Sequence, residues 1–301
     1  MGGILTMNLS TVSGARVVAH TEITLPADKT MGRLLIDAGL LKLSDVENIE
    51  RCQKELDLRF GEAAVILGLV RETDIIRMLA SQFEYSYLQP GEGGFSPELI
   101  AAYRPFSQQV EVFRNLRTQI KLRKVDENQK ALAVIGTNSG DGCTYLAANL
   151  ATVFSQLGER TVLVDANLRK PRQHQVFNLH QRQGLSDLLA GRCGLEVVTK
   201  IPQLKNLSIL PAGTVPPNPQ ELLSRPTFNA LLKDLACDFN LILIDSAPSA
   251  SLADNQIISS KANNALIVVR KHQTRAKDIL ALTKQLRDAK VNCVGAVLNE
   301  I

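Results

Sequence analysis

The sequence contains no apolar run that approaches the ~20 residues needed to span a bilayer as a helix, because charged residues interrupt every candidate. It lacks a basic segment followed by an apolar stretch and a small-residue cleavage site, so no secretory signal is expected. The five cysteines and four histidines have no paired or metal-ligand spacing, which argues against disulfides and a zinc site. These absences fit a cytoplasmic protein.

A strong excess of one charge is also absent. The 34 Lys and Arg residues nearly balance the 30 Asp and Glu residues, and no long basic run occurs, so no nucleic-acid partner is expected. What is present is an ordinary globular composition, 45% hydrophobic over 301 residues, which is enough for two cores.

The first part of the chain repeats itself. Residues 1–27 are rich in Ser, Thr and Gly and are predicted to be a flexible leader. Between 28 and 88 the spacing of glycines and apolar residues in each copy predicts a short helix, a glycine-ended turn and a longer amphipathic helix. We therefore predict a small all-helical domain with two similar halves at 28–88. With a period of 29 residues, Gly32, Gly39, Val46 and Gln53 recur as Gly61, Gly68, Ile75 and Gln82.

The second part alternates apolar, β-branched runs with amphipathic helices. Residues 89–108 contain several glycines and prolines and are predicted to be a linker, so the second domain spans 109–301. The alternation predicts an α/β fold, a mostly parallel sheet with helices on both faces. The predicted strands are Ala131–Ile135, Thr161–Val164, Leu207–Leu210, Leu241–Ile244, Ala265–Val269 and Val294–Leu298.

A glycine-rich loop follows the first of these strands and precedes a helix predicted from Thr144 to Leu157. A strand, such a loop and a helix with Thr at its start are the context of a Walker A phosphate loop. Main-chain N–H groups can cradle phosphate there, and the Thr144 hydroxyl can hold Mg²⁺. The predicted nucleotide-binding residues are Ser139, Gly140, Asp141, Gly142, Cys143, Thr144 and Tyr145.

Cys143 occupies the position where a Walker A loop has lysine. A neutral thiol cannot offset phosphate charge, and a contact of that kind at ~4 Å is worth at most about 4 kcal/mol at an effective dielectric near 20. We therefore expect phosphoryl transfer to be weakened more than nucleotide binding. A second interpretation is redox control of the loop, because a helix N-terminus tends to lower a thiol pKa.

Two aspartates end predicted strands. Asp165 follows Val164, and Asp245 follows Ile244. Carboxylates at the C-terminal edge of a parallel sheet lie beside its crevice, where they can reach Mg²⁺ or an attacking hydroxyl. Together with the glycine loop, these residues predict one ATP and Mg²⁺ site.

These motifs resemble the bacterial tyrosine kinases of exopolysaccharide chain-length control, in particular the EpsG-type branch, from about residue 30 to the end. The strings Pro216-Pro217-Asn218-Pro219-Gln220-Glu221-Leu222-Leu223 and Val297-Leu298-Asn299 match that family. The resemblance implies a P-loop NTPase fold like that of MinD and ParA. It also implies that Asp165 is the general base, that Asp165 and Asp245 are magnesium partners, and that Asn299 meets the adenine base.

The helix Glu111-Val112-Phe113-Arg114-Asn115-Leu116-Arg117 matches a motif that assembles the family into rings, so homo-oligomers through Glu111, Arg114 and Arg117 are implied. A membrane-bound, Wzz-like chain-length determinant is the implied partner, which would place the chain at the inner membrane peripherally. Three departures argue for reduced kinase activity: Cys143, Asn167 in place of the second catalytic aspartate, and no tyrosine after Tyr145.

The repeat at 28–88 resembles the N-terminal domain of type II secretion ATPases (MshEN-like), some of which bind cyclic di-GMP. The second copy keeps Arg59 of that motif, but the first has Thr30 where the arginine belongs. Two alternative functions therefore stay open. One is a non-catalytic adaptor, with cyclic di-GMP as a candidate ligand. The other is a MinD- or ParA-like ATPase, which is disfavoured because Asn138 stands where those proteins need a lysine.

Overall fold

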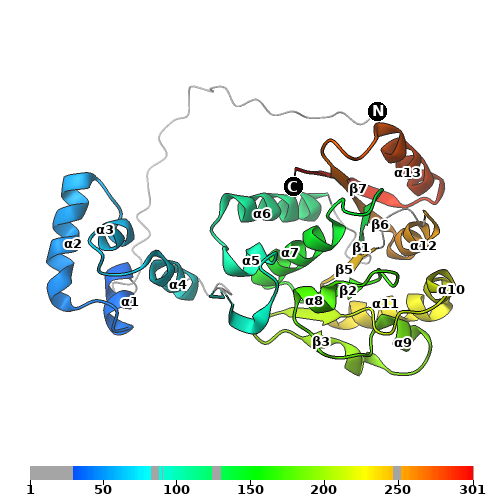
Figure 1. The fold of residues 1–301 in the computed structure, drawn as a ribbon, viewed down its shortest axis with the longest axis horizontal. Helices are drawn as coiled ribbons and strands as arrows, with labels where there is room; N and C mark the ends of the chain where they lie inside the picture. Colours follow the sequence, from blue (N-terminus) through cyan, green and yellow to red (C-terminus); the bar gives the residue numbers. More distant parts are fainter. Residues whose placement is uncertain (1–29, 83–87, 90, 124–129, 247–251, 301) are drawn as a thin grey trace. The chain divides into compact units, whose positions relative to one another are not determined.

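The computed structural model describes residues 30–82, 88–89, 91–123, 130–246 and 252–300; the predicted leader 1–27 lies outside them. The chain divides into two compact units, Met1–Arg71 and Glu72–Ile301 (Figure 1). None of the helices in the described ranges is long and apolar enough to cross a membrane. The predicted domain limits 28–88 and 109–301 stay a prediction.

The first unit contains α1 (Met31–Asp37), α2 (Leu43–Leu56) and α3 (Phe60–Ile66), and α4 (Glu72–Gln82) follows in the second. The starts of α1 and α3, and of α2 and α4, keep the spacing of the sequence repeat. Gly39 and Gly68 follow the short helices with φ of 70° and 69°, a conformation that glycine adopts without a Cβ penalty. Both copies therefore have the predicted helix, glycine turn and helix.

The second unit is built on one sheet. Its strands are β1 (Ala131–Gly136), β2 (Thr161–Asp165), β3 (Thr199–Lys200), β4 (Leu207–Leu210), β5 (Leu241–Asp245), β6 (Asn264–Arg270) and β7 (Asn292–Asn299). Their order is β3-β4-β2-β5-β1-β6-β7, and each pair is parallel except β3–β4. The predicted α/β fold with a mostly parallel sheet is confirmed. The sequence missed only β3, because two residues carry no periodicity.

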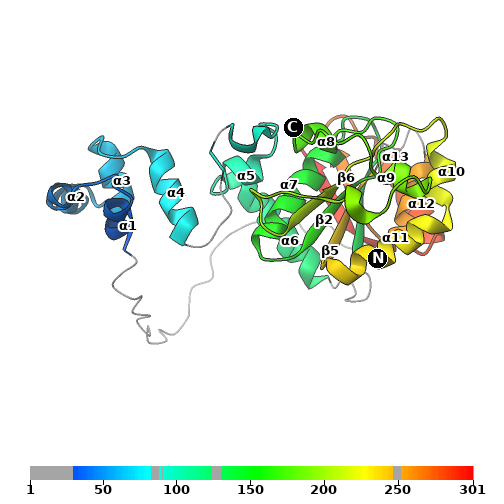
Figure 2. The same cartoon turned by 90° about the horizontal axis from the view of Figure 1, so that it is seen from below.

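Helices cover both faces of this sheet (Figure 2). One face carries α5 (Ile100–Tyr103), α6 (Gln108–Leu122), α7 (Cys143–Gln156) and α8 (Gln173–Val176). The other carries α9 (Leu185–Leu189), α10 (Pro219–Ser224), α11 (Pro226–Asp238), α12 (Leu252–Ala262) and α13 (Ala276–Asp288). Short 3₁₀ turns occur at Glu92–Gly94 and Leu195–Val197. Because helices bury the strands on both faces of the sheet, the strands appear in the sequence as continuous apolar runs.

Residues 95–103, inside the predicted linker, contribute to the core of the second unit. Phe95 and Leu99 are buried in the cluster on the α7 face of the sheet. The Ala101 amide donates to Asn149 Oδ1 in α7 (2.9 Å), and the Tyr103 hydroxyl donates to the Phe95 carbonyl (3.1 Å). The first contact fixes this segment on α7, and the second holds the segment together.

Candidate nucleotide-binding site

The glycine-rich loop lies between the end of β1 and the start of α7, as predicted. Gly140 and Gly142 have φ of 90° and 97°, which only glycine adopts without strain. Asp141, 1% exposed, organises the loop, because its Oδ2 accepts the amides of Thr137 (2.8 Å) and Asn138 (2.7 Å). Gly142 is the N-cap of α7, so the first amides of that helix have no intrahelical acceptor and suit an anion.

Cys143 is the first residue of α7 and is buried. A Cβ added to Gly136 would lie 2.7 Å from its Sγ, so the thiol packs back against the end of β1. Burial raises the pKa of the Cys143 thiol well above its usual value, and the nearby Asp245 and Asp141 raise it further. The expected lowering of this pKa by the helix N-terminus is therefore wrong, because desolvation outweighs the dipole.

Asp245 ends β5 directly beside Asp165 at the end of β2, since the two residues are register partners in neighbouring parallel strands. Both are fully buried. Burial raises the pKa of Asp245, and the carboxylate of Asp165 raises it further. Asp245 accepts hydrogen bonds from the Thr144 hydroxyl and from Gln173 Nε2 (2.9 Å), while its Oδ1 has no partner among the described residues.

A divalent cation fits this place. A carboxylate oxygen without a partner next to a threonine hydroxyl is an incomplete oxygen ligand set of the kind Mg²⁺ takes, with phosphate and water supplying the remainder. Within the described ranges, no group of three or more His, Cys, Asp or Glu side chains could hold a metal. Thr144 and Asp245 are thus the described residues that would hold Mg²⁺.

Asp165 holds the chain that follows β2. Its oxygens accept three main-chain amides: Asn167 (3.2 Å), Arg172 (3.0 Å) and Gln173 (2.9 Å). Burial nevertheless raises the pKa of Asp165 above its usual value. The Asn167 side chain accepts the Lys170 amide (3.1 Å), so it closes the same loop.

The remaining predicted residues lie around the loop. Ser139 and Gly140 are exposed at its tip, and Tyr145 packs edge-on against Phe113 at a centroid distance of 5.8 Å. Asn299, at the end of β7, donates from Nδ2 to the Asp141 carbonyl (3.0 Å). The structure thus brings all the predicted nucleotide and metal residues to the C-terminal edge of the sheet, and it gives Asn299 a contact with the loop itself.

Sequence reasoning missed two side chains that hold this site together. Gln173 bridges the Thr144 carbonyl (3.1 Å) and Asp245 (2.9 Å), and Thr274 donates to Asp141 Oδ1 (3.0 Å). Neither residue belongs to a motif, and each lies far along the chain from its partners. Only the folded sheet brings them near, so no sequence signal could have found them.

Two arginines in the loop after β2, Arg169 and Arg172, carry positive charge close in sequence to Asp165. Arg169 pairs with Asp254 (2.7 Å), and Arg172 pairs with Glu98 (2.6 Å). Both guanidinium groups are therefore already matched with carboxylates.

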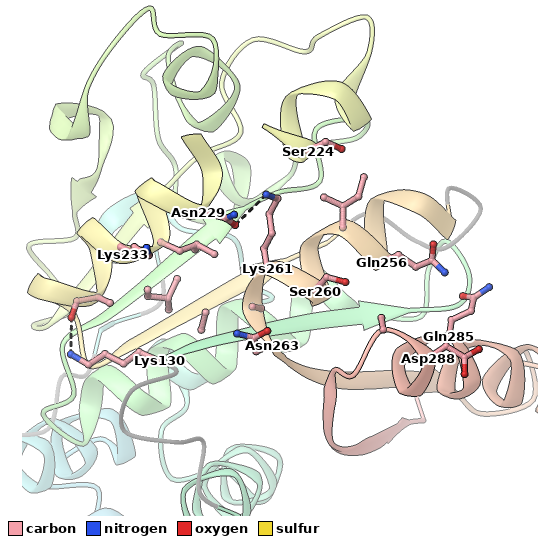
Figure 3. A pocket seen from close by; sticks show the side chains of 17 residues that line it. Lys130, Ser224, Asn229, Lys233, Gln256, Ser260, Lys261, Asn263, Gln285 and Asp288 are labelled. Carbon is pink, nitrogen blue, oxygen red and sulfur yellow. Dashed lines mark hydrogen bonds between the residues drawn. The ribbon is translucent and has the colours of Figure 1, made fainter. Parts of the chain in front are cut away.

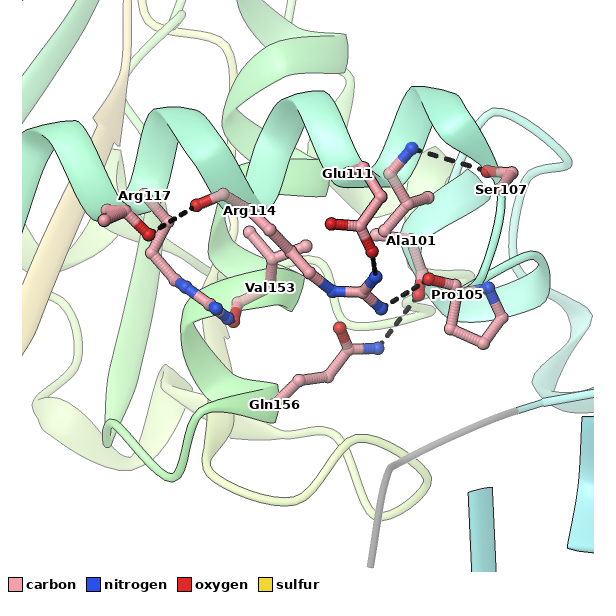
Figure 4. A network of polar contacts seen from close by, with 10 residues as sticks. Ala101, Pro105, Ser107, Glu111, Arg114, Arg117, Val153 and Gln156 are labelled. Atoms are coloured by element: carbon pink, nitrogen blue, oxygen red, sulfur yellow. Dashed lines mark hydrogen bonds and ion pairs between the residues drawn. The ribbon is translucent and has the colours of Figure 1, made fainter. Parts of the chain in front are cut away.

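The predicted assembly motif lies on α6, and its two arginines are bonded within the chain (Figure 4). Arg114 contacts Glu111 and the Pro105 carbonyl, while Arg117 Nη1 donates to the Val153 carbonyl in α7 (2.6 Å). The Arg114 side chain is only 14% exposed, whereas that of Glu111 is 56% exposed. Glu111 is thus the member of the motif that faces solvent.

A groove of about 980 Å³ lies at the other edge of the sheet, where β1 and β5 begin (Figure 3). Its lining includes Lys130, Lys233 and Lys261. Lys130 donates to the Ala236 carbonyl (2.7 Å) and Lys261 to the Arg225 carbonyl (3.2 Å), so these two lysines cap main-chain carbonyls. The groove is separate from the phosphate loop.

The fold and the site define the class of protein. A glycine loop between β1 and a helix, with Asp245 on the adjacent strand, is the arrangement of a P-loop nucleotide-binding protein. The family described as "AAA domain" matches residues 129–294. The septum site-determining protein MinD of Pyrococcus horikoshii, solved with Mg-ADP, shares the fold, with a TM-score of 0.50 and 23% identity over 56% of this chain and 70% of MinD.

Within that class, the chain belongs to the bacterial tyrosine-kinase family. It is 32% identical to tyrosine-protein kinase YwqD of Bacillus subtilis (strain 168) over 201 residues, 67% of this chain and 85% of YwqD. It is 30% identical to tyrosine-protein kinase wzc of Salmonella typhi over 68% of this chain, but it spans only 28% of that protein. The kinase domain of Escherichia coli tyrosine kinase ETK matches with a TM-score of 0.65 and 29% identity over 67% of this chain and 80% of that domain.

Proposed function

We propose that this chain is a nucleotide-binding, tyrosine-kinase-like regulator of exopolysaccharide chain length, polymerisation and export, of the EpsG type, with reduced phosphotransfer. The observation that carries the proposal is the buried Asp245, whose partnerless Oδ1 lies beside Thr144 at the start of the helix that follows the phosphate loop. A buried carboxylate oxygen without a hydrogen-bond partner lowers the stability of the fold unless a ligand binds to it. The tyrosine-kinase relatives support the choice of reaction class.

In this proposal each residue has one task. The amides of the phosphate loop and of the first turn of α7 hold the phosphates of ATP, and Thr144 and Asp245 hold the Mg²⁺ that accompanies them. When bound, Mg²⁺ neutralises phosphate charge. Asp165, whose pKa is raised by burial, is the general base that accepts the proton of an attacking hydroxyl. Asn167 keeps the loop after β2 closed around Asp165.

Reduced transfer follows from Cys143. A lysine at this position would stabilise the negative charge of the transition state more than that of the bound nucleotide. The chain therefore binds nucleotide and turns it over slowly. It works at the cytoplasmic face of the membrane through a membrane-bound, Wzz-like partner and as an oligomer.

The test is magnesium-dependent ATP binding and turnover of the purified chain and of Cys143→Lys. We expect the lysine variant to turn ATP over at least about 10-fold faster, which corresponds to about 1.4 kcal/mol in the barrier. Cys143→Met is the matched control, because it adds length without charge. If wild type already hydrolyses ATP as fast as Cys143→Lys, the argument from the missing lysine is wrong; if wild type binds no Mg-nucleotide, the proposed function is wrong.

A second candidate is an adaptor that responds to cyclic di-GMP through the helical repeat. The observation that favours it is that Thr30 and Arg59 are the N-caps of α1 and α3 and are both exposed. The two copies thus present their motif positions in the same local geometry, with one guanidinium available for phosphate. MinD- or ParA-like cargo positioning has no comparable observation in its favour.

Calorimetry of the full chain with cyclic di-GMP tests this second candidate. We expect measurable binding that Arg59→Ala abolishes and that Thr30→Arg strengthens about 10-fold, by restoring the second phosphate contact. Arg51→Ala, an exposed arginine of α2, is the control. Absence of heat with both wild type and Thr30→Arg would remove the sensing role.

A further inference from the structure

A cation that the sequence motifs did not indicate stands at the phosphate loop. Arg270 is the last residue of β6, the strand that pairs with β1 so that Val268 is the register partner of Gly136. This register brings Arg270 beside the loop, where its Nη1 donates to the Gly140 carbonyl (3.1 Å). The Arg270 amide also donates to Thr274 Oγ1 (2.9 Å), which is the threonine that contacts Asp141.

The guanidinium of Arg270 differs from the other arginines near the site. Arg169 and Arg172 are each paired with a carboxylate, whereas none of the described carboxylates forms an ion pair with Arg270. Its side chain is half-buried, and one of its five N–H donors is accounted for by the Gly140 carbonyl. Among the described residues, its positive charge therefore has no carboxylate in ion-pair contact.

Arg270 and Asn299 also fix the direction of two successive carbonyls of the loop. Arg270 holds the Gly140 carbonyl, and Asn299 holds the Asp141 carbonyl. In a trans peptide the C=O and N–H groups point in opposite directions, so these bonds turn the following amides away from Arg270 and Asn299. The Asp141 amide closes the loop onto the Asn138 carbonyl (3.3 Å), and the Gly142 amide is directed to the side opposite Asn299.

We propose that Arg270 is a positioning residue of the phosphate loop, and that its anchored, uncompensated charge replaces part of what the lysine absent at position 143 would supply to a bound nucleotide. This inference rests on the proposed nucleotide binding. An arginine that holds the Gly140 carbonyl fixes the peptide before Asp141, and with it the shape of the loop, and it adds a favourable field without touching the phosphates.

A double-mutant cycle tests it, with Mg-ADP binding measured by calorimetry for wild type, Arg270→Gln, Cys143→Lys and the double variant. We expect Arg270→Gln to weaken binding about 10-fold in wild type but only about 2-fold in Cys143→Lys, because the restored lysine then supplies the charge. Arg270→Lys keeps the charge and should recover part of the loss. Arg287→Gln, an exposed arginine of α13, is the control and should change nothing.

A second measurement needs no nucleotide. Hydrogen exchange of the loop amides in the ligand-free chain should quicken in Arg270→Gln and remain unchanged in Arg287→Gln. An equal loss of affinity in both backgrounds, or unchanged exchange of the loop, overturns the inference. If wild type binds no Mg-ADP, the proposed function fails. The role of Arg270 is then still decided by hydrogen exchange of the loop amides and by Mg-ADP binding of Cys143→Lys and of the double variant Cys143→Lys with Arg270→Gln.

Discussion

At the scale of single residues, Asp245 is where charge and burial conflict most. It is fully buried beside a second carboxylate, and burial together with Asp165 raises its pKa to about 8. A carboxyl group whose pKa is raised in the folded state stabilises the fold less as the pH rises through that value. The metal-free site therefore tolerates Asp245 in its protonated form, and a cation must displace that proton.

This conflict predicts how Mg²⁺ binding depends on pH. In the window from about 6 to about 8 set by the Asp165 and Asp245 pKa values, affinity for Mg²⁺ with ADP should rise with pH, because binding releases a proton. Calorimetry in buffers of different ionisation enthalpy measures that proton release.

Asp245→Asn removes the titrating group while keeping its shape. It should remove the part of the pH dependence of Mg²⁺ binding that lies near pH 8, and it should raise the melting temperature of the ligand-free chain above pH 8, where the wild-type carboxyl is charged. The control is Asp238→Asn, an exposed aspartate at the end of α11. A wild-type affinity that is flat between pH 6 and 8 would contradict the prediction.

At the scale of elements, α6 shows how contacts within the chain constrain a surface motif. The regular spacing of Glu111, Arg114 and Arg117 predicted a charged stripe for pairing with a neighbour. In the structure the two arginines bond to carbonyls of the segment before α6 and of α7, so they secure the helix on its own unit. We therefore predict that assembly through this helix depends on the carboxylate of Glu111, which is exposed.

That division predicts different outcomes for two substitutions on α6. Glu111→Lys should shift the protein toward monomer in sedimentation velocity with little change in its melting temperature, because the ion pair with Arg114 that it breaks is exposed on the Glu111 side and contributes little to stability. Arg117→Ala should lower the free energy of unfolding by about 1 kcal/mol, since it removes a hydrogen bond to a main-chain carbonyl. Glu55→Lys on α2 is the charge-matched control. Destabilisation by Glu111→Lys equal to that by Arg117→Ala would refute this assignment.

The helices and turns of the repeat were the part of the fold that the sequence predicted most fully. Its glycines predicted the turns, and the hydrogen bonds repeat too: Gly39 and Gly68 donate to Ile36 and Val65, three residues back in each copy. Local chemistry determines such turns, because a left-handed residue after a helix needs no tertiary partner. The packing is less local: a Cβ on Gly32 would lie 3.0 Å from the ring of Phe60, a contact between α1 and α3.

At the scale of the whole molecule, the sequence by itself determined the alternation of strands and helices, the glycine loop after β1 and the aspartates at the ends of β2 and β5. Period and turn chemistry are properties of neighbouring residues. Only the tertiary structure decided which strands are neighbours, and hence that Asp165 lies beside Asp245 and that Arg270 reaches Gly140. It also raised the pKa of Cys143, because burial depends on what covers a thiol and outweighed the helix dipole that the sequence implied.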